Sequence, residues 1–424
     1  MPNLAQLLTS KSSDEYRRVF DLCKVIGEEL DGVEGVFVVG GIVRDLIIGR
    51  EPGDIDLTVV GDANAFAAEL AVRTGAPVPT ESQFLTFKID TNDSVPGISS
   101  IDIVTARSET YAEPAALPDV SPSTVEDDLS RRDFTVNSMA ISLSAQNWGN
   151  LVDPSNGFGD IMRKRIKVLH DSSFVDDPTR MFRAVRYATR LDFSIDSRSE
   201  KLISESLQNI DQLSGTRIRN EFETILAEDT RVESLQMCEK LGILAAISPG
   251  LRVGTRALQV LEELAKNRTL SSDIQELLAL TTFGLNEDEA KQTVKRLSET
   301  SDWGESILGN AELAKTVTVL DQTDLRPSEV VEILSGIPLA SIRAYIEAGP
   351  PLPRRGRLID YVETLRFVEP EISGDDLLDI GIPQGPTIGE LLEVVRRSRL
   401  DGQVNSRQEE LELVKSRLPG FLTK

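Results

Sequence analysis

Residues 38–58 read VVGGIVRDLIIGREPGDIDLT, and no other stretch of the chain is as informative. The apolar run that ends at Val39 predicts a strand, the glycines at 40–41 predict a turn, and a short helix precedes a second strand. Two glycines allow a backbone to approach a phosphate closely, and a helix N-terminus favours an anion. Arg44, one turn into the helix, can add a charge-assisted hydrogen bond to that anion. The stretch therefore predicts a phosphate site.

Two carboxylates, Asp54 and Asp56, open the second strand. Because they are two residues apart, both point to one face of a strand, within reach of a shared divalent cation. A Gly-Gly turn or an Asp-x-Asp pair alone is more often a plain turn or a solvated strand end. Their order and spacing here argue against coincidence. Together they predict metal-assisted chemistry on a nucleoside triphosphate, with Asp54 and Asp56 as metal ligands.

The bulk composition limits the chemistry that the chain can perform. Its 424 residues predict two to four domains, and it has only two cysteines, far apart, and one histidine, His170. Zinc sites and histidine acid–base catalysis are therefore nearly excluded, so catalysis must use carboxylates, arginines and a metal. No apolar run is long enough to span a membrane and no secretory signal is visible. We expect a cytoplasmic protein with no membrane partner.

The charge distribution leaves a nucleic-acid partner open. A net charge of −23 argues against such a partner when taken alone. Residues 161–190, however, carry eight Lys or Arg against three Asp, and smaller basic groups recur at 354–357 and 396–399. An acidic body with a basic cleft is compatible with this pattern.

Hydrophobic periodicity predicts an α+β fold, with the strands confined to the first part of the chain. Strands are expected near 35–39, 55–60, 84–90, 100–105 and 135–143, and helices at 13–30, 42–48 and 62–74. Residues 107–127, rich in Pro, Ala and Ser, are expected to form a loop. Beyond residue 178 nearly every segment has helical periodicity.

Two further groups of residues complete the candidate site. In the strand expected at 100–105, Asp102 alternates with Ile101 and Ile103 and can meet Asp54 and Asp56 from a neighbouring strand. A helix is expected to begin at Asp177-Pro178, with Asp177 as N-cap and Pro178 in the first helical position. Its arginines fall on one arc, opposite an apolar face: Arg180, Arg183, Arg186 and Arg190.

These motifs resemble those of class II tRNA nucleotidyltransferases (CCA-adding enzymes) and bacterial poly(A) polymerases, which belong to the polymerase-beta-like nucleotidyltransferase superfamily. The resemblance lies in Gly40–Asp45 with Asp54 and Asp56, in residues 131–140, 153–160 and 176–186, and more weakly in 374–386. It implies a nucleotidyltransferase head, with a small mixed sheet and helices, followed by all-α neck, body and tail. The implied parts are an N-terminal helix (1–33), the head (34–165), a neck with the base-recognition helix (166–230), a helical body (231–350) and a helical, tRNA-binding tail (351–424).

The resemblance also implies a role for each site residue. Asp54 and Asp56 would hold Mg²⁺, and Asp102 would help to activate the 3′ hydroxyl of the primer. The triphosphate would be bound by Gly41, Arg44, Arg132, Arg183 and Arg186. Asp177 and Arg180 would bond to the Watson–Crick edge of the incoming base.

The implied activity is template-independent addition of the 3′ CCA end to tRNA from CTP and ATP, with the helical C-terminal half gripping the acceptor arm. An A-adding or CC-adding partial enzyme, or a poly(A) polymerase, is an alternative. Residues 111–118 look more like the A-adding and poly(A) branches than like common CCA-adding enzymes. A catalytically silent RNA-binding relative is disfavoured, because three converging carboxylates repel one another unless a metal is bound.

Overall fold

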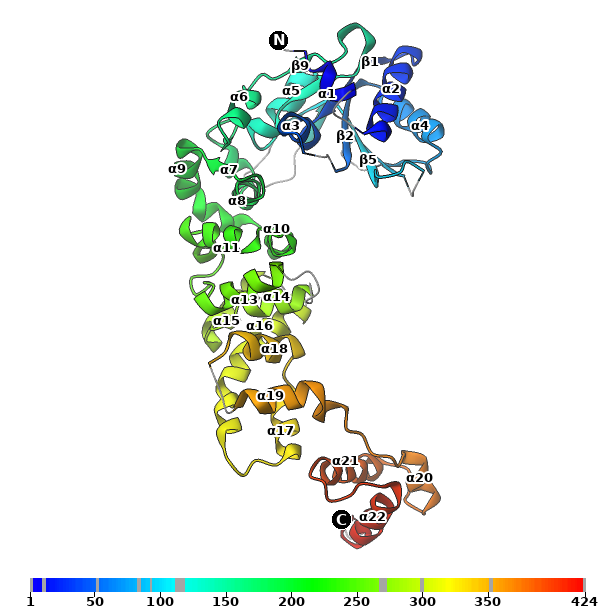
Figure 1. Cartoon of the computed structure of the whole chain (residues 1–424), viewed down its shortest axis with the longest axis vertical. Coiled ribbons are helices and arrows are strands. Elements are labelled where there is room, and N and C mark those ends of the chain that lie inside the picture. The colour runs from blue at the N-terminus through cyan, green and yellow to red at the C-terminus, as the bar shows by residue number, and fades with distance from the viewer. Residues whose placement is uncertain are drawn as a thin grey trace. The chain divides into compact units, whose positions relative to one another are not determined.

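The chain forms two compact units, residues 1–246 and 247–424. The computed structural model describes residues 3–9, 13–50, 53–81, 85–91, 94–110, 119–266, 273–297, 301–350 and 354–421. The predicted α+β class is confirmed, because the sheet lies in the first unit and the second is helical throughout its described residues (Figure 1). The finer division into neck, body and tail stays a prediction.

A mixed seven-stranded sheet forms the centre of the first unit, in the order β3-β4-β5-β2-β1-β8-β9. Its strands are β1 (Val33–Val39), β2 (Ile55–Gly61), β3 (Thr80–Glu81), β4 (Thr86–Asp90), β5 (Ser100–Thr105), β8 (Ala140–Ser142) and β9 (Leu151–Val152). Strands β2 and β5 are parallel, and the other neighbours in this sheet are antiparallel. The parallel pair is the one that carries the predicted carboxylates.

Helices cover this sheet because its strands alternate between apolar and polar side chains. Ile55, Leu57 and Ile101 are fully buried. The helix α4 packs on β2, β4 and β5, and α2 packs on α4 and β1 (Figure 1). On the face that carries Asp56, Thr58 contacts Asp128 of α5, so a short helix partly covers that side. The helices are α1 (Ala5–Thr9), α2 (Asp14–Glu29), α3 (Gly41–Ile48), α4 (Ala63–Thr74) and α5 (Val125–Ser130).

Two expectations for this unit were wrong. Residues 107–127 are not simply a loop, because β6 (Arg107–Thr110) pairs with β7 (Asp119–Pro122) and α5 follows; residues 111–118 lie outside the described residues. The strand expected at 135–143 is shorter, since Thr135–Asn137 is a 3₁₀ turn and only β8 is extended. Asp133 favours that turn, because its Oδ1 accepts from the Phe134 backbone and from Asn137 Nδ2.

The rest of the first unit is mostly helical, with one short parallel strand pair, β10 (Arg165–Ile166) and β11 (Ser194–Ile195). Its helices are α6 (Gly157–Met162), α7 (Ser173–Asp176), α8 (Thr179–Leu191), α9 (Ser197–Ser206), α10 (Gly215–Ala227) and α11 (Arg231–Lys240), and α12 (Ile243–Ile247) spans the division between the units. As predicted, α8 buries an apolar face that includes Met181, Val185 and Ala188. This packing turns its arginines toward the opposite side.

Two separate apolar clusters lie among the described residues of the second unit. One extends from Leu313 through Leu358 to Leu400, and the other joins Leu377, Leu391 and Val414. Its helices are α13 (Thr255–Lys266), α14 (Ile274–Thr281), α15 (Glu287–Leu297), α16 (Ser301–Thr316), α17 (Pro327–Leu334), α18 (Leu339–Ala348), α19 (Arg354–Glu363), α20 (Gly374–Asp379), α21 (Pro386–Leu400) and α22 (Arg407–Phe421). Among the described residues of the whole chain, none of the helices is long and apolar enough to cross a membrane.

Candidate active site

Strand register brings two of the predicted carboxylates side by side. Asp56 of β2 pairs with Asp102 of the parallel strand β5, and Lys88 of β4 lies opposite Asp102. Burial raises the pKa of Asp56 from 3.8 to about 6; Arg132 opposes the rise, whereas Asp102 and Asp54 add to it. Burial also raises the pKa of Asp102, whereas the positive charge of Lys88 opposes that rise. These carboxylates therefore share a poorly solvated place where a cation would relieve their repulsion.

Asp54 lies at the exposed start of the same strand. Its Oδ1 accepts a hydrogen bond from Ser99 Oγ at 2.6 Å and one from the Ser100 backbone at 3.2 Å. Among the described residues, no three His, Cys, Asp or Glu side chains form a ready-made metal cluster. The donor set nevertheless fits a hard cation, because carboxylate oxygens are the ligands that Mg²⁺ prefers.

A cavity of about 420 Å³ opens beside Asp56. It is lined by Val39, Gly40, Gly41, Asp56, Leu57, Val104, Arg107, Glu109, Arg131, Arg132, Asp133, Asn137, Asp177, Arg180, Arg183 and Tyr187. Gly40 has φ +75°, and a Cβ there would lie 2.8 Å from Arg132 Nη1 and 3.9 Å from Asp56 Oδ2. The glycine thus leaves a space between an arginine and a carboxylate, as a bound phosphate requires.

Arg132 borders this space, and its Nη1 is the atom closest to the position that a Gly40 Cβ would take. Its Nη2 donates to Asp128 Oδ2 at 2.9 Å, while its Nε is buried without a partner among the described residues. Asp128 is fully buried and also accepts from Arg131 Nε at 3.0 Å. Burial alone would raise the pKa of Asp128, but Arg132 and Arg131 lower it below its usual value. Asp128 is therefore an ionised anchor that holds both arginines in place.

Arg44 is not on the cavity wall but buried beneath it. It donates to Asp45 at 2.9 Å and to Asn137 Oδ1 at 2.6 Å. Asn137 in turn donates to Asp133 Oδ1 at 3.0 Å, and Asp133 Oδ2 accepts from Arg183 Nη2 at 2.7 Å. Burial would raise the pKa of Asp133, but Arg183, Asn137 and Arg180 together lower that pKa below its usual value. This hydrogen-bonded chain fixes Arg183 at the cavity.

Arg186 also lies away from the cavity wall. Its Nη1 is 3.5 Å from Glu228 and its Nη2 is 3.7 Å from Glu221. Of the predicted site residues, the cavity wall includes Gly41, Asp56, Arg132, Asp177, Arg180 and Arg183, and it does not include Arg44, Asp54, Asp102 and Arg186. The arginine arc of α8 is thus divided between the cavity and two glutamates, one in α10 and one at its end.

The two predicted base-reading residues reach the cavity from the start of α8. Arg180 is buried and donates to Ser173 Oγ at 2.8 Å and to the Arg131 carbonyl at 2.9 Å. Helix α8 begins at Thr179, with Pro178 as the N-cap, so the predicted start was one residue early. Asp177 still satisfies the helix end, because its Oδ1 accepts from the Thr179 backbone at 3.1 Å.

Sequence reasoning missed several residues of this site. The ring of Tyr187 lies against the cavity, with the guanidinium carbons of Arg44, Arg183, Arg186 and Arg190 between 5.0 and 5.5 Å from its centroid. It follows Arg183 by four residues, so helical spacing could have identified it. Asp128 and Asp133 were missed as well, and only their closeness to Arg131 and Arg132 was a signal.

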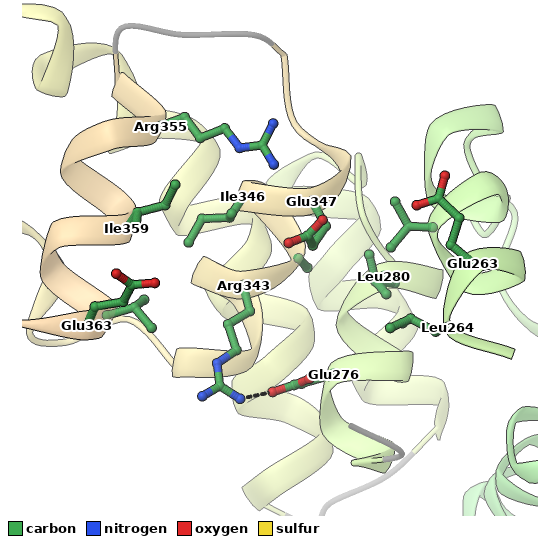
Figure 2. Close-up of a pocket in the computed structure, with 13 residues that line it drawn as sticks. Glu263, Leu264, Glu276, Leu280, Arg343, Ile346, Glu347, Arg355, Ile359 and Glu363 are labelled. Carbon is green, nitrogen blue, oxygen red and sulfur yellow. Dashed lines mark hydrogen bonds and ion pairs between the residues drawn. The ribbon is translucent and has the colours of Figure 1, made fainter. Parts of the chain in front are cut away.

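A second cavity, of about 440 Å³, lies between helices of the second unit (Figure 2). Its lining includes Glu263, Glu347 and Glu363 around apolar side chains, and Arg343 there is paired with Glu276. A mostly apolar lining in which glutamates outnumber Arg343 and Arg355 is unsuited to a triphosphate. The basic group at 396–399 is also largely neutralised, because Arg397 pairs with Glu332 and Arg399 with Glu371 and Glu410.

Comparison with known proteins identifies the family. Residues 36–167 match the model of the poly A polymerase head domain, and residues 192–253 match that of a probable RNA and SrmB-binding site of polymerase A. A solved CCA-adding enzyme (apo form II) is 30% identical, with a TM-score of 0.79 over 98% of this chain and 99% of that one. The chain belongs to the tRNA nucleotidyltransferase family.

Members of the tRNA nucleotidyltransferase family with different products resemble this chain. An A-adding tRNA nucleotidyltransferase of Geobacter sulfurreducens is 35% identical over 93% of this chain, which spans 46% of that relative. An A-adding enzyme of Halalkalibacterium halodurans is 29% identical, over 97% of this chain and 95% of its own length. A Thermotoga maritima CCA-adding enzyme solved with tRNA is 28% identical, with a TM-score of 0.71 over 98% of this chain and 99% of that one.

Proposed function

We propose that this chain extends the 3′ end of tRNA by metal-dependent nucleotidyl transfer from CTP and ATP, building or completing the CCA sequence. The observation that carries this proposal is the cavity of the first unit. Asp56 stands on its wall beside Asp102, Arg132 and Arg183 supply positive charge, and Asp177 with Arg180 offers an acceptor and a donor. Solved relatives bound to ATP, to CTP and to tRNA support the same assignment.

Asp56 and Asp102, with Asp54 at the strand start, are the residues that would hold Mg²⁺. When bound, Mg²⁺ would neutralise the triphosphate and lower the pKa of the attacking 3′ hydroxyl. The raised pKa of Asp56 fits this role, since a buried carboxylate among other carboxylates binds a cation in place of a proton. Asp102, the neighbour of Asp56 on the parallel strand, would accept the hydroxyl proton from the primer.

The triphosphate would lie between the Gly40 turn and Arg132. Nη1 of Arg132, the atom next to the Gly40 space, can donate to a phosphate oxygen while Asp128 accepts from Nη2 of the same guanidinium. Arg183, fixed by Asp133, would add a second charge-assisted contact. These arginines are pre-organised by buried carboxylates, so little side-chain ordering is left for the binding step.

Base selection would come from the protein itself. C and A each present an amino donor beside a ring-nitrogen acceptor, whereas U and G present the reverse order. Asp177 can accept from that amino group, and Arg180, held by Ser173 and by the Arg131 carbonyl, can donate to the ring nitrogen. The site therefore favours C and A without a nucleic-acid template.

Addition of the terminal A alone is a second candidate, favoured by the A-adding relatives that are 35% and 29% identical. One experiment separates the two. We expect a tRNA that ends at the discriminator base, supplied with CTP and ATP, to be extended by three nucleotides. Extension only of a tRNA that already ends in CC would instead establish A addition, and no incorporation on either tRNA would refute nucleotidyl transfer.

Replacing the acceptor should relax base choice. We expect Asp177→Ala to reduce the preference for ATP over GTP by about tenfold to a hundredfold, the scale of one lost charged hydrogen bond, while inorganic triphosphate binds as before. Competition binding with the four nucleotides measures this. Asp171→Ala, which removes an exposed carboxylate paired with Arg198, is the matched control. Unchanged selectivity together with a less stable helix would leave Asp177 as a helix cap only.

A further inference from the structure

Arg217, in the first turn of α10, contacts the residue that would read the base. Its Nη2 donates to Asp177 Oδ1 at 2.8 Å across 40 positions of sequence. The place of Arg217 is set by its own helix, since Ser214 Oγ caps α10 by accepting from the Arg217 backbone at 3.3 Å. The contact therefore connects the residues just before α8 with α10, a helix that the sequence did not indicate as part of the site.

The two oxygens of Asp177 are used unequally. Oδ1 accepts from Arg217 at 2.8 Å, from the Thr179 hydroxyl at 2.7 Å and from the Thr179 backbone at 3.1 Å. No described residue donates to Oδ2, although Asp177 lines the cavity. Three donors that converge on one oxygen fix the plane of a carboxylate, because rotation about its last bond would break them together. Oδ2 is thus the oxygen left for a ligand.

Helix α10 presents a second charged side chain to the same region. Glu221, one turn after Arg217, has an Oε2 that is buried without a hydrogen bond among the described residues. Burial raises its pKa; Arg183 and Arg186 oppose that rise, and Asp177 and Asp133 add to it. The charge of Asp177 therefore acts on Glu221, and the rotamer of Asp177 also decides how close the two carboxylates come. A guanidinium on Oδ1 holds Asp177 in one arrangement.

We propose that Arg217 is a positioning residue for base selection: it clamps Asp177 Oδ1 so that Oδ2 faces the amino group of an incoming C or A. The inference rests on the proposed function, which it deepens by adding a residue outside the base-reading helix. Arg217 does not touch the base. It removes the rotational freedom that would let Asp177 turn away and so admit U or G.

The competing explanation is a purely structural ion pair between α10 and the segment before α8. Both explanations predict some loss of stability when Arg217 is replaced. They differ in the base preference that they predict for the variant, because loss of a purely structural ion pair should not change the ratio of ATP to GTP affinity. That ratio is therefore the measurement that decides between them.

The test uses nucleotide binding to the full chain, by calorimetry, for the wild type and for Arg217→Met, Arg217→Lys and Arg198→Met. Arg198 is the matched control, because it forms an exposed ion pair with Asp171 in the same unit and does not line the cavity. We expect Arg217→Met to reduce the ATP:GTP affinity ratio by about tenfold, Arg217→Lys to restore most of it, and Arg198→Met to leave it unchanged. Inorganic triphosphate should bind all four proteins alike.

An unchanged ratio in Arg217→Met would overturn the inference, and so would an equal fall in the ratio for Arg198→Met. If Arg217→Met does not fold, Arg217→Gln, which keeps a donor without the charge, takes its place and is judged by the same ratio. Incorporation assays on tRNA are kept separate. A wild type that incorporates nothing refutes the proposed function, whereas an active wild type with an insensitive Arg217 refutes the positioning role alone.

Discussion

Asp56→Asn should reduce nucleotide incorporation by about 10³-fold or more while leaving the fold intact, as expected when a catalytic group is removed. The change keeps the size of the side chain and removes the charge that stands beside Asp102 and near Arg132. Single-turnover incorporation into tRNA measures the effect. Asp21→Asn, at an exposed position of α2, is the control and should retain full activity. Activity within about tenfold of wild type would refute Asp56 as a metal ligand.

The same substitution should change how stability depends on pH. Because the pKa of Asp56 is raised to about 6 in the folded chain, the folded state holds its proton more tightly than the unfolded state. This favourable contribution is fully present below about pH 4 and is lost as pH rises through about 6. We therefore expect metal-free Asp56→Asn to be more stable than wild type in urea at pH 7.5, with the difference disappearing near pH 4. Mg²⁺ should stabilise the wild type more than the variant.

Asp128→Asn should lower the free energy of unfolding by about 3 kcal/mol and weaken the binding of all four nucleotides alike. Asp128 is fully buried and holds Arg131 and Arg132, so the neutral amide removes the carboxylate that Arg132 pairs with and leaves Arg131 with Glu109. Urea unfolding and calorimetry measure the two effects. The nearby Glu126→Gln, at an exposed position, should change stability little.

The pH dependence of the Asp128 contribution has the opposite sign from that of Asp56. The pKa of Asp128 is lowered in the folded chain, so its contribution is fully present above about pH 4 and is lost as pH falls through the lowered value. The difference in the free energy of unfolding between wild type and Asp128→Asn should therefore become smaller at acid pH. If that difference in the free energy of unfolding stays constant from pH 7 to pH 3, the ion pairs of Asp128 are not its cause.

Local sequence patterns were enough to predict the strands β1, β2, β4 and β5 and the first helices of the head. The alternation around Asp102 predicted that Ile101 and Ile103 share one face, and both are fully buried. Strand register then placed Asp102 beside Asp56, as expected from two parallel strands that each carry an outward carboxylate. Such features depend on neighbours within a few residues, which is why the sequence alone reveals them.

The positions of individual arginines could not be predicted in the same way. Arg44 and Arg186 have the spacing of phosphate ligands, yet each meets side chains far away in sequence, Asn137 for Arg44, and Glu221 and Glu228 for Arg186. The hairpin of β6 and β7 likewise depends on two segments separated by residues 111–118. Periodicity predicts which face of a helix or strand a side chain lies on. It does not predict which residue, distant in sequence, packs against that face and forms the hydrogen bond or ion pair.

The hydrogen-bonded chain from Arg44 through Asn137 and Asp133 to Arg183 connects α3, which follows the glycine turn, with α8. If α3 moved away, the buried amide oxygen of Asn137 would lose Arg44, and if α8 moved away, the buried carboxylate of Asp133 would lose Arg183. Either loss makes local opening costly. The backbone amides of α3 and α8 should therefore exchange with deuterium as one cooperative unit, although about 130 residues separate the two helices along the chain.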